Sequence, residues 1–377
     1  MYPRQLRKTI KSLQRPGFIN LIYGPRRIGK STLIKEITTH ISPFNLLWIN
    51  GDLAEDRLSF ETTSLVKLQG LLKMKTHLVV DEAQQIDNIG ATLKIIVDHF
   101  PDLTIYVTGS SSLSLQQNAK SSLTGRHQTF YLYPLTTTEL SYDLPPHQTS
   151  GLLETQLLYG GYPYLQRLTS SQEKITYLKT LINDYLFQDL YNLTNINKPK
   201  IIEKLATLLA FQIGSQVSFN ELANQLGIDV KTVQSYIELL KQIFVIVELP
   251  SFSTNQRNEL KHSKKYYFLD LGIRNALSDS FQSLSVRPDI GALWENFLIL
   301  ERIKQNHYQN WGNSYYFFRT YTQQEIDLIE TKDNQISAYE FKWRSDKAKL
   351  PKSWQEHYPQ SSFALINQNN YLDSFVR

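Results

Sequence analysis

FINLIYGPRRIGKST, residues 18–32, is the stretch that decides the fold. Its first six residues are an apolar run of strand length, and a helix-like pattern continues from its end to His40. Residues 24–31 match G-x-x-x-x-G-K-[ST] at every fixed position. A strand, a glycine-rich turn and a helix in this order are typical of a phosphate-binding loop, or P-loop. Gly24 and Gly29 let the backbone curl, so that its N–H groups face phosphate oxygens at the helix N-terminus.

The other fixed positions of the loop have chemical roles as well. The Lys30 ammonium reaches the β- and γ-phosphates of a nucleotide, and the Ser31 hydroxyl coordinates Mg²⁺. The sequence therefore predicts ATP and Mg²⁺ as cofactors, with Lys30 as a catalytic residue. The predicted nucleotide contacts in this loop are Gly24, Pro25, Arg26, Arg27, Ile28, Gly29, Lys30, Ser31 and Thr32.

A pair of acidic residues follows a later apolar run. After a second predicted strand at Leu46–Asn50, a third at His77–Val80 leads into Asp81 and Glu82. Two carboxylates at the end of such a strand are typical of the Walker B motif. In this motif Asp81 holds the Mg²⁺ shell, and Glu82 orients and deprotonates the attacking water. The spacing favours the ATPase branch with a catalytic glutamate, in which a strand is inserted between the P-loop strand and the Asp81 strand.

Two further segments supply candidates for the same site. The predicted strand Thr104–Val107 runs into TGSSS, where Thr108 or Ser110 would contact the γ-phosphate or the attacking water. Glycine and serine also simply form turns. Arg126 precedes a fifth predicted strand at Phe130–Tyr133. It would stabilise transition-state charge on the nucleotide of a neighbouring subunit, which implies a homo-oligomer, or it is an ordinary surface arginine.

The alternation of strands and helices predicts an α/β fold with a parallel sheet and helices on both faces. All of the motifs fall at the carboxyl ends of strands, where such sheets bind ligands.

The middle of the chain has a helix-turn-helix pattern. Residues 145–147 with the polar residues after them are typical of a linker, and residues 152–192 and 201–213 have helical periodicity. Ser218 and Asp229 are expected to cap two short helices that meet at a turn at Gly227. The second helix would expose Lys231, Thr232, Gln234 and Ser235, and bury Val233, Ile237 and Leu240.

A β-rich segment follows these two helices, with predicted strands at Phe244–Leu249 and Tyr266–Leu269. It would form the wing of a winged helix, with cations at Arg257, Lys261, Lys264 and Lys265. DNA binding is one interpretation of the exposed groups, because they are the types that contact phosphates and base edges. A rigid spacer or a contact with a protein partner is the other.

The C-terminal segment has the spacing of a metal-dependent nuclease. A predicted helix at Ala292–Lys304 contains Glu295, a strand contains Asp327, and another contains Glu340-Phe-Lys342. Glu340 and Lys342 lie on one face of their strand because side chains alternate. Carboxylates there would hold Mg²⁺ and activate a water, with the lysine in support. The predicted metal ligands are Glu295, Asp327 and Glu340, with Glu325 as a competing ligand on the same face, and the predicted catalytic residues are Asp327, Glu340 and Lys342.

Several motifs together carry a family resemblance. They are GPRRIGKST (24–32), VVDEAQ (79–84), TGSS (108–111), LTGR (123–126), YPLT (133–136), YGGYP (159–163) and FLDLG (268–272). The chain resembles prokaryotic AAA-type ATPases that have a C-terminal restriction-nuclease-like domain of the PD-(D/E)XK type. The resemblance covers nearly the whole chain. It implies an ATPase core at residues 1–145, a helical lid or linker at 146–200, a winged-helix-like domain at 201–284 and a nuclease-like α/β domain at 285–377.

Composition excludes several classes of protein. The 377 residues contain no cysteine, which excludes disulfides, thiolate metal sites and a cysteine nucleophile, and agrees with a cytoplasmic location. No apolar run is long enough for a membrane span, and the N-terminus lacks the apolar core of a signal peptide. The net charge of +5 comes largely from an N-terminal arm, which is expected to be a solvated helix face or to touch nucleic acid. The cations of this arm are Arg4, Arg7, Lys8, Lys11 and Arg15.

Two functions remain open from the sequence. The first is an ATP-hydrolysing, DNA-binding protein with a Mg²⁺-dependent nuclease domain. The second is a nucleotide-controlled regulatory switch, whose winged helix and C-terminal domain bind DNA or protein without cleavage.

Overall fold

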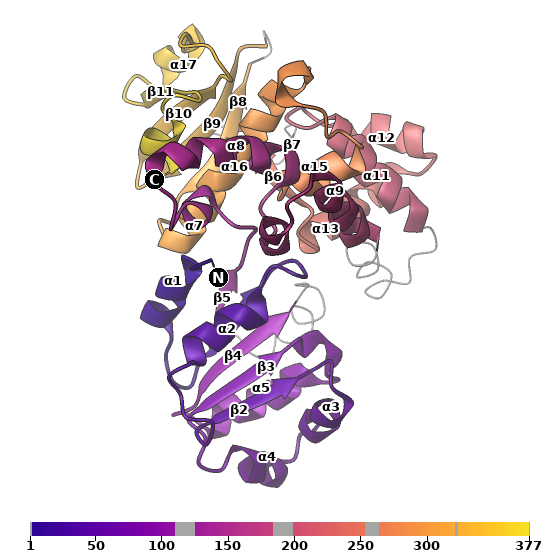
Figure 1. Cartoon of the computed structure of the whole chain (residues 1–377), viewed down its shortest axis with the longest axis vertical. Coiled ribbons are helices and arrows are strands. Elements are labelled where there is room, and N and C mark those ends of the chain that lie inside the picture. Colours follow the sequence, from indigo (N-terminus) through magenta and orange to yellow (C-terminus); the bar gives the residue numbers. More distant parts are fainter. Residues whose placement is uncertain (1, 110–124, 184–198, 253–263, 321–322, 377) are drawn as a thin grey trace.

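The computed structural model describes residues 2–109, 125–183, 199–252, 264–320 and 323–376. Figure 1 shows two bodies, one built around the strands β1–β5 and the other built from α7 onward. The elements of the first body are α1 (Leu6–Leu13), β1 (Ile19–Tyr23), α2 (Lys30–Thr38), β2 (Leu46–Asn50), α3 (Ala54–Phe60), α4 (Leu65–Leu72), β3 (His77–Asp81), η1 (Ala83–Gln85), α5 (Ile89–His99), β4 (Thr104–Gly109) and β5 (His127–Tyr131).

The first body contains a five-stranded sheet in the order β2-β3-β4-β1-β5. All of its neighbouring strands are parallel. β4 lies between the P-loop strand β1 and the Asp81 strand β3, so the predicted inserted strand is present. β5 begins three residues before the predicted Phe130, because Ile19 of β1 pairs with His127. The predicted α/β fold is therefore confirmed. The largest correction to a strand is at β5, and the bounds of β1, β3 and β4 differ from the predicted ones by one or two residues.

Apolar side chains cover both faces of this sheet. On one face α1 and α2 pack with Leu6, Ile10, Leu33 and Ile34 fully buried. On the other face α4 and α5 contribute a separate core that includes Leu68, Leu72, Leu93 and Ile96. Two covered faces leave the carboxyl edge of the strands as the place where ligands reach the sheet.

The N-terminal arm differs from its prediction at one residue. Arg7, Lys8, Lys11 and Arg15 are exposed, as a solvated helix face requires. Arg4 is buried instead. Its guanidinium donates to the Ile28 carbonyl at 3.0 Å, to the Tyr133 carbonyl, to Glu139 at 3.2 Å and to the Tyr308 hydroxyl at 3.4 Å. Arg4 therefore joins the P-loop to α7 (Thr137–Leu140) and α16 (Ile290–Gln309) of the second body.

The second body begins with helices. They are α7 (Thr137–Leu140), α8 (Pro146–Tyr159), η2 (Pro163–Arg167), α9 (Ser171–Leu181), α11 (Pro199–Phe211), α12 (Phe219–Leu226), α13 (Val230–Gln242), α15 (Leu271–Leu277) and η4 (Leu284–Val286). The linker predicted at residues 145–147 is wrong, because α8 begins at Pro146. Proline is accepted in the first turn of a helix, where its missing N–H has no partner to lose. The chain reverses after α8 at Gly160, which has a positive φ of 77°.

The predicted helix-turn-helix elements are present. The Ser218 hydroxyl accepts from Glu221 N at 3.3 Å, and the Asp229 carboxylate accepts from Thr232 N at 2.9 Å. Gly227 between the helices has φ of 65°, in the left-handed region that favours glycine. Two antiparallel strands follow, β6 (Ile246–Pro250) and β7 (Lys264–Phe268). These are the elements of a winged helix, and that assignment stays a prediction.

Two of the four cations predicted for the wing, Arg257 and Lys261, lie outside the described residues. Lys264 is partly exposed, as a wing requires. Lys265 is buried, so its predicted place on the wing surface is wrong. Four consecutive residues of β7 are buried, and Lys265 is covered by Glu295 of α16 and by Glu325 from the C-terminal segment.

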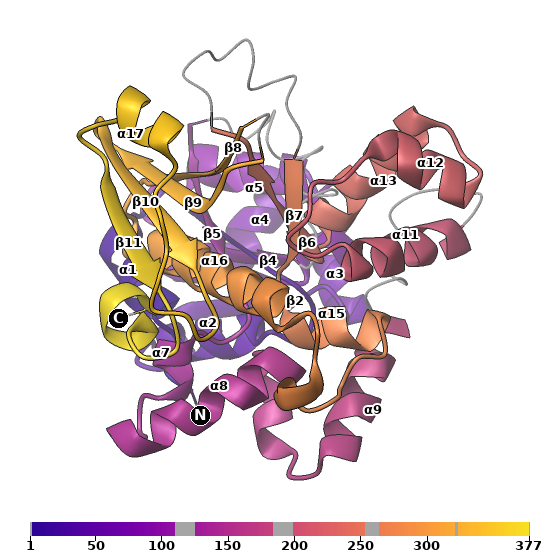
Figure 2. The same cartoon turned by 90° about the horizontal axis from the view of Figure 1, so that it is seen from above.

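The C-terminal segment forms a second sheet, in the order β11-β10-β9-β8. Its elements are α16 (Ile290–Gln309), β8 (Ser314–Arg319), β9 (Glu325–Lys332), β10 (Gln335–Phe341), α17 (Lys352–His357), β11 (Ser362–Ile366) and η5 (Leu372–Val376). Figure 2 shows α16 running beside this sheet. Trp294 of α16 packs edge-on against Trp343 and Tyr371, with ring centroids 5.5 Å and 5.2 Å away. Phe252, just after β6, donates its N–H to the Phe317 carbonyl of β8 at 2.6 Å and so joins the middle segment to this sheet.

Within the described ranges, no helix is long and apolar enough to cross a membrane.

The Arg4 network predicts a strong effect on stability. Arg4→Ala leaves the buried Glu139 carboxylate without its cation and two carbonyls without the guanidinium donor, and breaking such a buried pair costs about 3–5 kcal/mol. The midpoint of thermal unfolding should fall by several degrees. Arg7→Ala, on the exposed side of the same arm, is the matched control and should change the midpoint by less than about 2 °C, since exposed charges contribute little. Equal midpoints for the two variants would contradict a structural role for Arg4.

Candidate functional site

The P-loop lies between β1 and α2 and has two glycines that other residues would disturb. Gly29 has φ of 96°, which other residues rarely adopt. A Cβ on Gly24 would lie 2.3 Å from the Leu132 carbonyl oxygen, so that position is closed to any side chain. The loop therefore passes tightly over the end of β5. The predicted reason for the glycines, a tightly curled backbone, agrees with this geometry.

Lys30 lies at the centre of the loop. Its side chain is buried, and its ammonium donates to the Gly24 carbonyl at 3.0 Å and to the Pro25 carbonyl at 3.1 Å. The ammonium thus lies within the curl of the backbone, where phosphate oxygens would approach. Ile28 differs from its neighbours, because its side chain belongs to the core and its carbonyl accepts from Arg4. Ile28 can therefore contribute to the loop through its backbone, and its predicted contact with the nucleotide stays a prediction.

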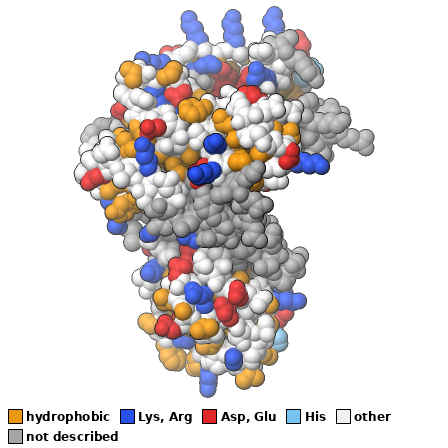
Figure 3. Space-filling view, turned by 90° about the vertical axis from the view of Figure 1, so that its right-hand side faces the viewer, with side chains coloured by type: hydrophobic (Ala, Val, Ile, Leu, Met, Phe, Trp, Pro, Cys, Tyr) orange, Lys and Arg blue, Asp and Glu red, His pale blue; other side chains and the backbone are white. Residues whose placement is uncertain are grey.

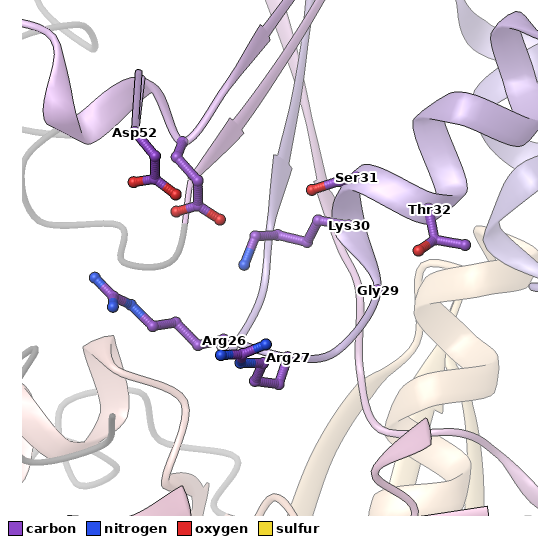
Figure 4. Close-up of a pocket in the computed structure, with 8 residues that line it drawn as sticks. Arg26, Arg27, Gly29, Lys30, Ser31, Thr32 and Asp52 are labelled. Carbon is purple, nitrogen blue, oxygen red and sulfur yellow. The ribbon is translucent and has the colours of Figure 1, made fainter. Parts of the chain in front are cut away.

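A cavity of about 500 Å³ opens at this edge of the sheet. It is lined by Arg26, Arg27, Gly29, Lys30, Ser31, Thr32, Asp52 and Glu82. Figure 4 shows Lys30 and Arg26 extending into it, with Ser31 beside Lys30 and Thr32 pointing away. Asp52 was not among the sequence candidates. It lies two residues after the end of β2, and the rule that ligands bind at carboxyl ends of parallel strands is the signal that would have identified it.

The two Walker B acids are held by a threonine of the neighbouring strand. The Thr108 hydroxyl donates to Asp81 Oδ1 at 2.5 Å and accepts from the Glu82 N–H at 2.9 Å. Glu82 has φ of 50°, in the left-handed region. A Cβ at Gly51 would lie 2.3 Å from the Glu82 carbonyl oxygen, so β2 also presses on this turn. These contacts fix the backbone of Glu82, whose side chain lines the cavity, and Gln84 Nε2 donates to the Glu82 carboxylate at 2.5 Å.

This geometry changes the prediction for Thr108. The side chain is fully buried and its hydroxyl is engaged by both acids, so it positions Asp81 and Glu82 rather than lining the cavity. Ser110, the other candidate at this strand end, lies outside the described residues.

Arg126 and the P-loop lie at opposite ends of the parallel sheet. Arg126 directly precedes β5, at the amino end of the parallel strands, whereas the P-loop lies at their carboxyl end. Its guanidinium pairs with Asp98 of α5, and its side chain is 52% exposed. This position excludes contact with the nucleotide site of the same chain, and it is open to a neighbouring subunit. Its role in a second subunit stays a prediction.

A second group of acids lies in the C-terminal domain. Glu295 of α16 and Glu325 and Asp327 of β9 each have a carboxylate oxygen within 4.8 Å of the others. Glu325 and Asp327 share one face of β9 because they are two residues apart. Glu325, which the sequence left as a competing ligand, therefore belongs to the group. Glu340 pairs instead with Lys342, at 2.6 Å.

Lys265 of β7 reaches into this acidic group from the middle segment. Its ammonium lies 2.9 Å from Glu295 Oε1 and also contacts Glu325. Burial alone would lower the pKa of Lys265, but the two carboxylates outweigh burial and raise it, so the ammonium stays charged. The Tyr267 hydroxyl, from the same strand, donates to Glu295 Oε1 at 2.5 Å. The acids are therefore neutralised in part by a cation that belongs to another segment of the chain.

Asp327 has a raised pKa. Burial raises the pKa of Asp327 well above its usual range, and nearby Glu295 and Glu340 raise it further. Its Oδ2 accepts from Phe341 N at 2.7 Å, which ties β9 to β10 at this point. Crowded carboxylates of this kind need a cation to stay ionised together. Their hard oxygen atoms suit Mg²⁺, so the donor set fits the predicted metal.

Comparisons with protein families divide the chain into three matches. Residues 17–141 match the model of an AAA domain family. Residues 150–284 match a domain of unknown function (DUF8612), and residues 290–373 match another (DUF4143). The first match supports an AAA-type P-loop ATPase domain, which binds nucleotide and typically Mg²⁺. The other two matches carry no assigned activity.

Curated relatives with similar sequences come from bacteria and an archaeon. An uncharacterized protein of Mycobacterium tuberculosis is 26% identical over 325 residues, which are 85% of this chain and 69% of that protein. One of Methanocaldococcus jannaschii is 25% identical over 340 residues, 85% of this chain and 73% of the relative. One of Haemophilus influenzae is 22% identical over 339 residues, 85% of this chain and 81% of the relative.

Solved structures give weaker similarity. A DNA polymerase III gamma subunit-related protein from Thermotoga maritima has 12% identity and a TM-score of 0.26, covering 64% of this chain and 97% of that one. Drosophila ORC bound to DNA has 12% identity and a TM-score of 0.28, covering 73% of this chain and 94% of that one. TM-scores of this size do not establish a shared fold.

The position of Lys265 predicts an unusual response to metal. Lys265→Met keeps the length of the side chain but removes the buried ammonium from the half-buried carboxylates of Glu295 and Glu325. Glu325 keeps Arg319 at 3.5 Å, so the cost should lie at the lower end of the about 3–5 kcal/mol that a broken buried pair costs. The thermal midpoint should fall by several degrees, and millimolar Mn²⁺ should restore part of the loss by replacing the lost charge.

Lys264→Met is the matched control for this measurement. Lys264 is 36% exposed and pairs with Glu248 at 2.8 Å, so its loss should cost less than about 1 kcal/mol and should not respond to Mn²⁺. An unchanged midpoint for Lys265→Met would show that the acidic group does not depend on this lysine.

Proposed function

We propose that the protein hydrolyses ATP at the cavity between the P-loop and the Walker B acids, and that it binds DNA. The observation that carries the ATPase proposal is the convergence of Lys30, Ser31 and Glu82 on one cavity of about 500 Å³. Cations and backbone N–H groups lie on one side of it, and carboxylates lie on the other. A nucleoside triphosphate needs cations and N–H groups for its phosphates, and its metal ion needs carboxylates.

Each residue of this site has a proposed role. Lys30 would move from the Gly24 and Pro25 carbonyls to the β- and γ-phosphates, because those phosphates offer a stronger, charged acceptor. Ser31 and Asp81 would hold Mg²⁺, which supplies charge neutralisation at the phosphates. Glu82 would orient the attacking water and accept its proton, and Thr108 would hold both acids in place.

Arg126 extends this proposal to an assembly. Its half-exposed side chain at the amino end of β5 leaves it free to act on the nucleotide of a neighbouring subunit. An arginine supplied in this way stabilises the charge of the transition state. The Asp98 pair would open on contact, since an exposed ion pair holds its partner weakly.

Turnover of ATP is the test of this site. Lys30→Ala should abolish phosphate binding, whereas Glu82→Gln should keep ATP binding and lower turnover about 10²–10⁴-fold, because proton transfer to the glutamate is lost. Lys35→Ala, an exposed lysine one turn further along α2, is the matched control and should hydrolyse ATP normally. Normal turnover by Glu82→Gln would refute Glu82 as the catalytic base.

The DNA-binding proposal rests on the second helix of the helix-turn-helix elements. Lys231, Gln234 and Ser235 of α13 are exposed, while Val233 and Ile237 are buried against the rest of the unit. A capped, well-packed helix with a polar outer face is the arrangement by which winged helices enter the major groove. A protein partner on the same face is the alternative.

The C-terminal domain supports two proposals that differ in chemistry. Glu295, Asp327 and Glu340 with Lys342 have the composition of a PD-(D/E)XK nuclease site, and Glu325 adds a further ligand. In that proposal the domain cleaves DNA with Mg²⁺. The contact of Lys265 with Glu295 and Glu325 favours the second proposal, a regulatory switch that binds DNA or protein without cleavage, because a lysine already supplies positive charge to the acids.

Cleavage of supercoiled plasmid DNA separates the two proposals. If the domain is a nuclease, the wild type nicks plasmid with Mg²⁺ or Mn²⁺ and Asp327→Ala does not, since a metal ligand is lost. Asp333→Ala, at an exposed position in the turn after β9, should cleave like the wild type. A wild type that never nicks DNA with either metal would remove the nuclease proposal and leave the ATPase and the switch.

A further inference from the structure

The segment at residues 342–352 has an unusual charge. It contains five Lys or Arg side chains and one acid, whereas residues 285–377 as a whole contain eleven of each sign. Four of the five cations are exposed, and none of these four has an ion pair within the described residues. They are Arg344, Lys347, Lys349 and Lys352. We call residues 342–352 the basic loop.

The one acid of the basic loop is engaged elsewhere. The Asp346 carboxylate accepts from Asn367 Nδ2 at 2.7 Å, and the Ser345 carbonyl accepts from the same amide at 3.3 Å. This carboxylate is therefore held against the chain after β11. Arg344 before it and Lys347 and Lys349 after it are exposed and have no ion pair among the described residues.

Both ends of the basic loop are fixed beside the acidic group. The loop begins at Lys342, which pairs with Glu340, directly after the strand whose Phe341 N–H donates to Asp327. It ends at α17, where the Ser353 hydroxyl donates to Gln324 Oε1 at 3.2 Å, one residue before Glu325. The loop thus leaves the sheet where β10 ends and returns to the same end, where β9 begins. Figure 3 shows Lys and Arg side chains projecting from the end of the molecule that the C-terminal domain forms.

The far end of the loop is anchored by a buried aromatic. Trp354 of α17 is fully buried, and its Nε1 donates to Ser361 at 2.8 Å. Phe318 packs edge-on against it at 4.8 Å. Lys352 is therefore part of a packed helix, α17, so less conformational entropy is lost when it binds a ligand.

We propose that the basic loop binds the phosphodiester backbone of DNA beside the acidic group of the C-terminal domain. This inference rests on the proposed DNA binding, and it names the surface that carries it. A polyanion fits an exposed row of unpaired cations, and each phosphate neutralised releases counterions. A strand whose phosphate approaches the acids would pass next to this loop, because both ends of the loop lie at that edge.

Salt dependence of binding tests this surface. A short labelled duplex is titrated with the full chain, in Ca²⁺ in place of Mg²⁺ to limit cleavage, and the dissociation constant is measured by fluorescence anisotropy from 50 to 250 mM salt. The triple variant Lys347→Gln/Lys349→Gln/Lys352→Gln should bind at least tenfold more weakly at the lowest salt. Its slope of log K against log[salt] should be smaller by about 2–3, because about 0.9 is lost per phosphate contact.

A control triple keeps the change in net charge the same. Lys67→Gln/Lys73→Gln/Lys94→Gln removes three exposed lysines from the first body and should change the slope by less than 1. Both triples should hydrolyse ATP like the wild type, which shows that they fold.

The outcomes separate the two proposals. If the wild type binds the duplex and the two triples lose the same affinity, the basic loop is not the surface and DNA binding stands. If the wild type does not bind duplex DNA at all, the proposed DNA binding fails and the loop inference fails with it. ATP turnover reports on the ATPase proposal independently of both results.

Discussion

The guanidinium of Arg4 is the contact on which the arrangement of the molecule depends. It is buried between the P-loop, the chain after β5, α7 and α16, and it pairs with Glu139 at 3.2 Å. Because it is buried, each of its partners must stay in place or leave a charge unpaired. The helix it reaches, α16, contains both Tyr308 and Glu295, thirteen residues or about 20 Å apart along the helix axis. One helix therefore connects the joint at the P-loop to the acidic group.

The two candidate sites both bring carboxylates together, and they differ in where the neutralising cations lie. Each gathers carboxylates at the end of a sheet. At the P-loop, Lys30 and Arg26 line a cavity opposite Asp52 and Glu82, so opposite charges face each other across open space. In the C-terminal domain, Lys265 from β7 lies directly on Glu295 and Glu325. The first arrangement leaves room for a phosphate chain, and the second leaves the acids already in contact with a cation. This difference favours a bound phosphate chain at the P-loop and carboxylates neutralised by lysine in the C-terminal domain.

Local patterns predicted most of the fold. The strand Leu46–Asn50 has the predicted bounds, and Ser218 and Asp229 cap the helices expected of them, because strand runs and caps depend on neighbouring residues. The buried places of Arg4 and Lys265 could not be predicted, since their partners lie 135 and 30 residues away. The start of α8 at Pro146 was not predicted, because its first residues have the composition of a linker. Whether they are helical depends on the packing of the residues that follow them. The place of Asp52 in the cavity lining depends on the order of the strands in the sheet, which local sequence patterns do not give.

A structure of the protein with Mg²⁺ and a non-hydrolysable ATP analogue tests the central claim most directly. The account predicts the triphosphate within hydrogen-bond distance of the backbone N–H groups of residues 26–31. Lys30 should have left the Gly24 and Pro25 carbonyls for the phosphates, and Glu82 should lie across the γ-phosphate with Thr108 still on Asp81. A nucleotide bound elsewhere, or Lys30 still on those two carbonyls with the analogue present, would contradict it.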